Sequence, residues 1–272
     1  MSESFEDQGG AASSNPPALL RWGMSKVLSR IATAPAQAKR RAKAEAKRRK
    51  EGRRHRIEYF HQVEDGYSHL AAQLLGPLAE RYDVELVCHL VRVPRDANLP
   101  EPGLLLPLSR YDSAKVAPHY GLSFPDGAGA PDAKQVDLAE RILAGVSQED
   151  FAPAVVAVGT ALWSGDIAEL DAIAGRVSPA SRADADRKLE EGTARRSKLG
   201  HYSAGMFHCE GEWYWGADRF YHLEERLAAG GADKQTDTPD SAPDPTSSTA
   251  RSATTVRSPS SSIPRSAVPT PR

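Results

Sequence analysis

Cysteine is scarce in this chain of 272 residues, which contains only Cys88 and Cys209. The two are far apart in the sequence, so neither a Cys-x-x-Cys pair nor the spacing of a cysteine metal site is present. Because thiol–disulfide exchange needs an attacking thiolate and a second thiol nearby, this composition argues against a dithiol oxidoreductase. Two cysteines in so long a chain are typical of a reducing compartment, and we expect both to be reduced and buried.

Long apolar runs are also missing. No stretch approaches the about 20 apolar residues that a membrane-spanning helix needs. The N-terminus begins with polar residues and is not followed by an apolar segment of the kind found in secretory signals. We therefore expect a soluble, cytoplasmic protein.

Positive and negative charges nearly balance, with a net charge of −1, but they are distributed unevenly. Between Lys39 and Arg56 there are eleven Lys or Arg residues and only two acids. Just before this run, positions 20, 24, 27, 28 and 31 are apolar at helical spacing. Residues 18–56 therefore fit an interfacial helix beside a polybasic patch on an anionic membrane surface. Phosphate contacts to nucleic acid and an unpartnered helical extension are the alternatives.

Composition divides the chain into three zones. Residues 1–55 are first polar and then basic, and we expect an arm that is partly helical or disordered. Residues 56 to about 228 carry the aromatic residues and the apolar periodicity of a folded core. Residues 230–272 are rich in Ser, Thr, Pro, Ala and Arg and should be disordered, because they cannot bury enough apolar surface to offset chain entropy.

The order of elements in the middle zone predicts an α/β fold. Segments 56–60 and 84–90 have strand patterns, and a helix over 67–82, kinked by Pro77, is expected between them. This is a βαβ unit with a right-handed crossover. A hairpin with strands at 205–209 and 212–215 and a closing helix, capped by Asp218, are expected at the end of the zone. Helical periodicity occupies the intervening segments 109–120, 136–143, 151–163, 167–174 and 181–198.

Two motifs at opposite ends of this zone resemble the DsbA superfamily, in particular its 2-hydroxychromene-2-carboxylate isomerase branch, which is related to kappa-class glutathione transferases. Residues 59–72 are similar to the family's aromatic strand, Ser-Pro-Tyr-Ser-Tyr turn and Leu-Ala-Ala helix. Residues 212–220 are similar to its closing Phe-Trp-Gly-x-Asp-Arg-Leu signature. The resemblance implies a thioredoxin-like fold (βαβ–ββα) formed by residues 56–93 and 199–229, with residues 94–198 as an inserted helical domain.

The chain departs from the family at both hallmark positions. Asp65-Gly66-Tyr67-Ser68 stands where the redox branch has Cys-x-x-Cys, and Asp65 stands where the isomerase branch has serine. The resemblance also implies a cis-proline that faces this turn, and Gly205 occupies its position. It further implies that glutathione lies between the turn and Ala204-Gly205-Met206, and that Ala217 and Asp218 hold its γ-glutamyl end.

Asp65 and Ser68 are the catalytic candidates, and each has a structural alternative. Asp65 is expected to be ionised, because the N–H groups and the dipole of the following helix favour a negative charge. It would then act as an anion mimic or a weak base, although it could not stabilise a glutathione thiolate, or it would only cap the helix. Ser68 could donate to a bound thiol or be solvated. Asp218 likewise could bind the ammonium group of glutathione or serve only as a cap.

The histidines at 61, 69, 201, 208 and 222 come from the two motif regions, but their spacing matches no metal signature, and no metal site is predicted. His61 and His69 are the most interesting because they flank the turn. Trp213 and Trp215 share one face of the last strand, and we expect them in the core.

The leading hypothesis is a DsbA-like protein with glutathione-dependent isomerase or transferase activity on a small organic substrate. It rests on fold and motif resemblance. The alternative is an inactive family member that acts as a binding or scaffold module directed by its basic arm. Either function is compatible with a homodimer.

Overall fold

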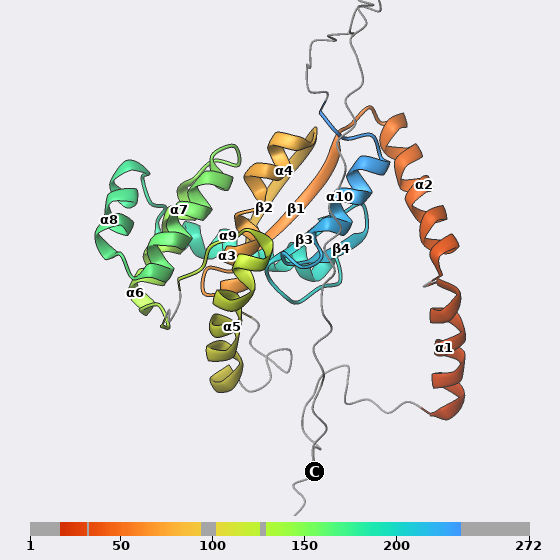
Figure 1. Ribbon diagram of the computed structural model, residues 1–272, viewed down its shortest axis with the longest axis horizontal. Helices are drawn as coiled ribbons and strands as arrows, with labels where there is room; N and C mark the ends of the chain where they lie inside the picture. Colours follow the sequence, from red (N-terminus) through yellow and green to blue (C-terminus); the bar gives the residue numbers. More distant parts are fainter. Residues whose placement is uncertain (1–16, 32, 94–101, 126–128, 235–272) are drawn as a thin grey trace, which may run out of the picture. The chain divides into compact units, whose positions relative to one another are not determined.

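A computed structural model describes residues 17–31, 33–93, 102–125 and 129–234 of the chain (Figure 1). Most of the tail that we expected to be disordered, residues 235–272, lies outside these ranges. So do residues 1–16 of the arm and residues 94–101 of the proline-rich connection.

Four strands form one mixed sheet in the order β2-β1-β3-β4 (Figure 1). β1 is parallel to β2, and β3 is antiparallel to both β1 and β4. A βαβ unit whose first strand pairs with a C-terminal antiparallel hairpin in this order is a thioredoxin-like fold, which confirms the predicted fold class. The strands are β1 (His55–His61), β2 (Val84–Leu90), β3 (Met206–Cys209) and β4 (Glu212–Trp215).

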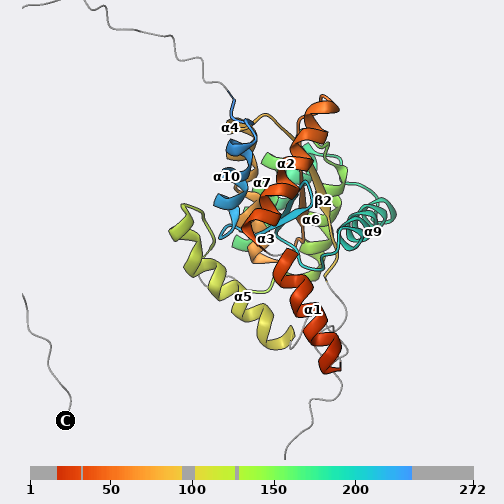
Figure 2. The ribbon, with the colours of Figure 1, turned by 90° about the vertical axis from the view of Figure 1, so that its right-hand side faces the viewer.

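Helices cover both faces of the sheet. In Figure 2, α4 and α10 lie on one side of it and α9 on the other. The block between β2 and β3 is helical, as predicted, and α9 and α6 pack against β2 while α5 and α7 pack against α3. The helices that follow β1 are α3 (Gly66–Ala72), α4 (Leu75–Arg81), α5 (Pro102–Val116), α6 (Ala133–Gly145), α7 (Phe151–Ser164), α8 (Ile167–Arg176), α9 (Arg182–Lys198) and α10 (Phe220–Ala229), with a 3-10 turn at Ala117–Tyr120. None of the described helices is long and apolar enough to cross a membrane.

The helix expected over residues 67–82 is two helices, α3 and α4. The chain breaks at Gln73 and Leu74, and Pro77 is the third residue of α4. A residue in the first turn of a helix has no acceptor for its N–H within the helix, so proline is tolerated there but not in the middle of a longer helix. Pro77 therefore marks the start of a second helix and not a kink in one.

The two faces of the sheet differ in chemistry. On one face Ile57, Tyr59 and Phe207 are fully buried in the main apolar core, together with Leu223 and Leu227 of α10. Alternation along β1 turns Glu58 and Phe60 to the opposite face.

Glu58 is a buried acid that the sequence analysis missed. Its carboxylate accepts hydrogen bonds from Arg195 of α9, at 2.7 and 2.5 Å, and faces His89 Nε2 of β2 at 3.0 Å. Burial by itself raises the pKa of Glu58, but these hydrogen bonds outweigh it and hold the pKa below its usual value. The ion pair thus ties α9 to the centre of the sheet.

The arm is helical in its described part, with α1 (Ala18–Ile31) and α2 (Ala34–Lys50). Thr33 caps α2, and β1 begins soon after α2 ends. The beginning of the predicted tail also differs from expectation, because Gly230–Lys234 belongs to the fold: Asp233 pairs with Tyr82, and Lys234 N donates to Arg81 O.

The contact of α9 with β2 gives a test of the fold. Gly192 of α9 lies so close to β2 that a Cβ atom there would be 2.1 Å from the carbonyl oxygen of Leu90. Gly192→Ala should lower the free energy of unfolding by about 1–3 kcal/mol or more, since overpacking moves backbone against backbone. Gly175→Ala, in α8 with open space around it, is the matched control and should be neutral or slightly stabilising. Equal urea midpoints for the two variants would contradict the packing.

Candidate functional site

The turn between β1 and α3 is a closed hydrogen-bonded unit. Asp65 is the N-cap of α3, and its Oδ2 accepts from Ser68 N at 2.9 Å and from Ser68 Oγ at 2.6 Å. Ser68 Oγ also accepts from Gln62 N, at 3.3 Å. Ser68 is fully buried, so the expectation that it is solvated is wrong. The capping role of Asp65 is confirmed.

The surroundings of Asp65 oppose the ionisation that we expected. Burial raises the pKa of the Asp65 carboxyl above its usual value, in spite of the hydrogen bonds from Ser68 and from the backbone of Tyr67. Loss of hydration therefore outweighs the favourable field of a helix that has only seven residues. The carboxyl supports the turn through its hydrogen bonds to Ser68.

Gly205 faces this turn, as the family resemblance implies for the residue in its position. Its φ is +65°, and a Cβ atom would lie 3.2 Å from Ser68 N and 3.3 Å from Ser68 Cα. Gly205 N donates to Phe60 O, and Gly205 O accepts from Gly216 N, both at 2.9 Å. The glycine therefore fixes the ends of β1 and β4 against the first turn of α3. Ala204 and Met206 on either side are buried.

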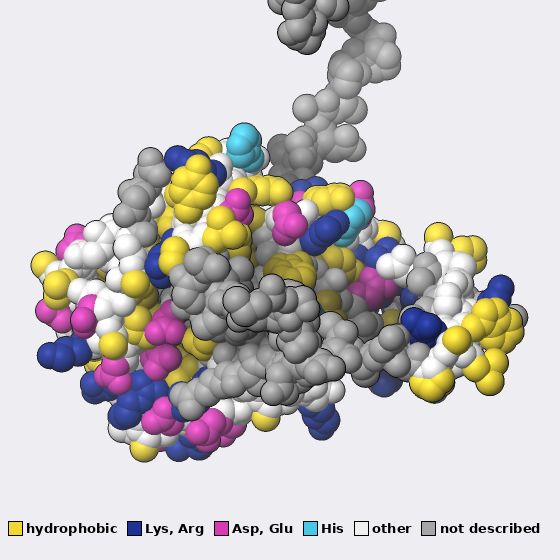
Figure 3. Space-filling model, turned by 90° about the horizontal axis from the view of Figure 1, so that it is seen from below, with side chains coloured by type: hydrophobic (Ala, Val, Ile, Leu, Met, Phe, Trp, Pro, Cys, Tyr) yellow, Lys and Arg dark blue, Asp and Glu magenta, His cyan; other side chains and the backbone are white. Residues whose placement is uncertain are grey.

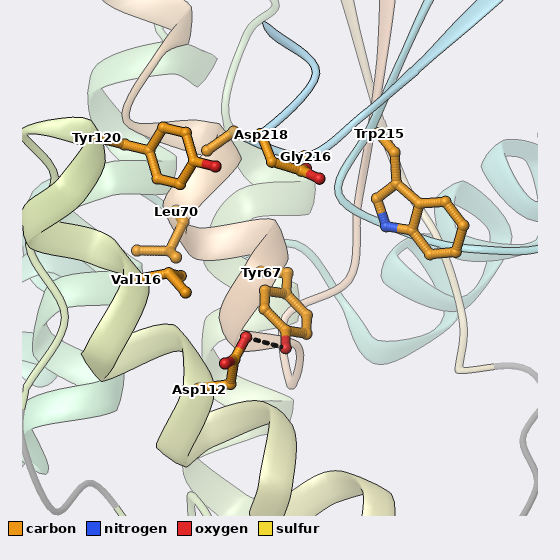
Figure 4. A pocket seen from close by; sticks show the side chains of 9 residues that line it. Tyr67, Leu70, Asp112, Val116, Tyr120, Trp215, Gly216 and Asp218 are labelled. Atoms are coloured by element: carbon orange, nitrogen blue, oxygen red, sulfur yellow. Dashed lines mark hydrogen bonds between the residues drawn. The ribbon is translucent and has the colours of Figure 1, made fainter. Parts of the chain in front are cut away.

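A cavity of about 400 Å³ opens beside this joint (Figure 4). Its walls come from three segments: the first turns of α3, the second half of α5 with the 3-10 turn, and the segment that follows β4. Tyr67 Oη donates to Asp112 Oδ2 across the floor, at 2.6 Å. The lining residues are Tyr67, Leu70, Asp112, Val116, Tyr120, Trp215, Gly216, Ala217 and Asp218.

Ala217 and Asp218, the two residues expected to hold a γ-glutamyl group, both line this cavity. Asp218 is not a helix cap, because α10 begins at Phe220 with Arg219 in the N-cap position. Its side chain is 54% exposed, and its ion partner among the described residues is Arg219, with Nε 3.8 Å from Oδ2. The alternative that Asp218 serves only as a helix cap is therefore wrong.

The α5 wall of the cavity was not predicted. Residues 109–120 were expected to be helical, but nothing in the sequence marked Asp112 or Tyr120 as site residues. Asp112 lies within hydrogen-bonding distance of Tyr67 only because α5 packs against α3. The sequence did contain one signal for such a residue: the hydroxyl of Tyr67 in the turn needs a hydrogen-bond partner. That partner can be located only once the packing of the inserted helices is known.

His61 and His69 are buried and do not reach the cavity. Burial lowers the pKa of His61 to about 3 and that of His69 to about 4, so both are neutral at pH 7. His61 Nδ1 lies 3.0 Å from the hydroxyl of Tyr59, which donates to Ser68 O. In the described part of the chain, no three His, Cys, Asp or Glu side chains are placed to hold a metal ion.

Cys88 and Cys209 are buried and free, as predicted. They lie on β2 and β3, on either side of β1, which pairs with Cys88 through Tyr59 and with Cys209 through Ile57. Burial raises the pKa of both thiols, that of Cys209 to about 12. Neither sulfur is positioned or ionised for redox chemistry.

The tryptophans of β4 lie outside the main core, contrary to expectation. Tyr214 between them points into the core, so strand alternation places Trp213 and Trp215 on the other face, and Trp215 is 48% exposed. Trp213 packs against Phe60 and His201. Together with Met206 and Arg41 of α2, both tryptophans line a second, more open hollow of about 690 Å³.

No family model matches this sequence, and no curated protein does. The structure is similar to that of 2-hydroxychromene-2-carboxylate isomerase, with a TM-score of 0.47 and 17% identity over 64% of this chain and 95% of that one. It is also similar to a protein from Nitrosomonas europaea assigned as a disulfide isomerase, with a TM-score of 0.47 and 17% identity over 65% of this chain and 97% of that one. A third similar structure is that of a protein from Streptomyces coelicolor assigned as a DsbA oxidoreductase, with a TM-score of 0.48 and 13% identity over 65% of this chain and 90% of that one. The fold assignment itself rests on the strand order and pairing described above.

The raised pKa of Asp65 predicts that this residue makes the stability of the protein depend on pH. Since the folded state holds this proton more tightly than the unfolded chain, ionisation of Asp65 removes stability as the pH rises through and above its ordinary value of 3.8. Asp65→Asn keeps the capping oxygen without the charge. Its stability relative to the parent should therefore increase between pH 4 and 8 in urea unfolding. Asp166→Asn, at the exposed cap of α8, is the control. A pH-independent difference for Asp65→Asn would contradict the assignment.

The lowered pKa of His69 predicts that stability changes with pH in the opposite direction. Because the unfolded chain binds a proton near pH 6.5 and the folded state only near pH 4, stability should fall as the pH drops through this window. The loss from this residue is up to about 3 kcal/mol at about 1.4 kcal/mol per pKa unit. His69→Gln should reduce the loss, whereas His222→Gln, at an exposed site on α10, should not. Parallel pH profiles for parent and His69→Gln would exclude a buried neutral His69.

Proposed function

We propose that this protein is a non-redox, small-molecule-binding member of the thioredoxin-like fold, and that its cavity holds a ligand through an ammonium group. Glutathione is the candidate that the sequence resemblance implies. The observation that carries the proposal is the composition of the cavity wall: three aromatic side chains, Tyr67, Tyr120 and Trp215, and two carboxylates, Asp112 and Asp218.

This combination suits a positively charged group. The face of an aromatic ring attracts a cation, and a nearby carboxylate adds a charge-assisted hydrogen bond. Among the described residues that line the cavity there is no Lys, Arg or His to oppose such a ligand. The volume of about 400 Å³ is within the usual range for small-molecule sites.

One end of glutathione fits these residues better than the other. Its γ-glutamyl ammonium would pair with Asp218, and the adjoining carboxylate would accept from the backbone N–H groups of Ala217 and Asp218, for which no acceptor is found in the described part of the chain. The glycine carboxylate has no cation among the lining residues. The proposal is therefore recognition of the γ-glutamyl end, and the aromatic wall also suits other organic ammonium compounds.

Binding is better supported than the isomerase or transferase activity of our leading hypothesis. Asp65 and Ser68 are hydrogen-bonded to one another, and Ser68 has no exposed surface. Neither is in a position to activate the sulfur of a ligand in the cavity, and the protein's own thiols are buried. These features favour the alternative hypothesis, a family-like scaffold that binds without this chemistry.

Calorimetric titration tests the proposal. Glutathione should bind, and S-methylglutathione should bind with similar affinity because the thiol is not used. Cysteinylglycine, which keeps an ammonium group but lacks the carboxylate that adjoins it in the γ-glutamyl group, should bind more weakly. Asp218→Ala should weaken binding by about one to two orders of magnitude, since a hydrogen bond to a charged group contributes about 1.5–3 kcal/mol.

Asp171→Ala, which removes an exposed acid on α8, is the matched control and should leave the affinity unchanged. If choline binds and glutathione does not, the ammonium site stands and glutathione is the wrong ligand. No heat with millimolar glutathione or choline, from a protein shown to be folded, would overturn the proposal. An unchanged affinity in Asp218→Ala would place the ligand elsewhere.

A further inference from the structure

The α2 helix is fixed to the sheet by one of its faces. Arg41 donates to Glu212 of β4 through Nε at 2.9 Å and through Nη2 at 2.6 Å. Four and seven residues later, Glu45 and Arg48 pair with each other, and Glu45 Oε2 also lies 3.5 Å from His55 Nε2. Residues at this spacing share one helix face. The α2 helix is therefore attached to the sheet through β4 and the start of β1.

The opposite face of α2 carries a stripe of lysines. Lys39, Lys43, Lys47 and Lys50 follow one another at intervals of four, four and three residues, and all four are exposed. At about 100° per residue they point away from Arg41, Glu45 and Arg48. The two acids between Lys39 and Arg56, Glu45 and Glu51, pair with Arg48, Arg49 and Arg53, and Glu51 also lies 3.8 Å from Lys47 Nζ. The outward face of α2 is therefore strongly positive.

The α1 helix, which precedes α2 in the chain, exposes large apolar side chains. Leu19 is 80% exposed, Trp22 62%, Leu20 53% and Met24 49%. Figure 1 shows α1 continuing from α2 beyond the sheet, and α1 contacts α2. Seen from below in Figure 3, hydrophobic and basic side chains lie together on the right-hand side, where Figure 1 places α1. Lys26 Nζ lies 5.9 Å from the centre of the Trp22 ring.

From these observations we infer that α1 and the lysine stripe of α2 bind the surface of an anionic lipid bilayer. The apolar side chains of α1 enter the headgroup region, and the lysines lie over the lipid phosphates. A helix with exposed Trp and Leu beside a polybasic segment is the composition that interfacial binding requires. Nucleic acid offers phosphates as well, but contact with its backbone would leave Leu19, Leu20, Trp22 and Met24 in water. The exposed apolar side chains of α1 therefore favour a lipid surface over nucleic acid as the partner.

Co-sedimentation of the full chain with vesicles tests the inference. The protein should pellet with vesicles of phosphatidylcholine containing one third phosphatidylglycerol and not with phosphatidylcholine alone. Pelleting should fall in 1 M salt, where the screening length is about 3 Å. Lys43→Glu with Lys47→Glu should weaken partitioning at least tenfold, and Leu20→Ala with Trp22→Ala should do the same at constant charge.

The matched control is Lys134→Glu with Lys198→Glu, which makes the same charge change on exposed lysines of α6 and α9 and should bind vesicles like the parent. Equal partitioning of the control and the α2 variant would overturn the inference. So would tighter, Lys43- and Lys47-dependent binding to a DNA duplex with no vesicle binding. The ligand affinity of the cavity, measured in the α2 variant, should stay unchanged, which separates this test from that of the proposed function.

Discussion

The close contact between Gly205 and the first turn of α3 determines the geometry of the site. There the backbone ahead of β3 lies against Ser68 without room for a side chain, and the hydrogen bonds of Gly205 reach both Phe60 at the end of β1 and Gly216 at the end of β4. A left-handed φ and the absence of Cβ are both required at this point, and only glycine supplies them without strain. This contact brings Tyr67 of α3 and the segment with Ala217 and Asp218 to the same cavity.

The same contact explains why the turn can lack cysteine and remain well structured. Asp65 and Ser68 satisfy each other's hydrogen-bonding groups, and the cost of desolvating the carboxyl appears as its raised pKa. A thiol pair would have left this turn reactive. Here the turn is a structural support, and the chemically accessible groups are those of the cavity beside it.

Sequence reasoning succeeded where the pattern was local. The alternation of β1, the hairpin at Glu210-Gly211 and the periodicity of α7 and α9 each identify an element without knowledge of its neighbours. Reasoning by motif singled out Ala217 and Asp218, which both line the cavity.

It failed where the outcome depended on packing or burial. For Asp65, the sequence shows the favourable helix dipole but not the loss of hydration that raises the pKa of its carboxyl. The prediction that Asp218 caps α10 was wrong because the helix begins one residue later, with Arg219 in the cap position. Asp112 and the buried acid Glu58 escaped notice because their partners, Tyr67 and Arg195, lie on elements distant in sequence.

The strand order also has a consequence for how this chain reaches its folded state. β1 lies between β2, which follows it closely, and β3, which arrives only after the whole inserted helical block. During synthesis the βαβ unit can form early, but the β3 side of β1, with Tyr59 and Ile57, has no partner until residues 206–209 are available. An unpaired strand edge of this kind is a template for association with other chains. Because closing so long a loop is slow, the insertion that builds one wall of the cavity also lengthens the time during which the nascent chain needs protection.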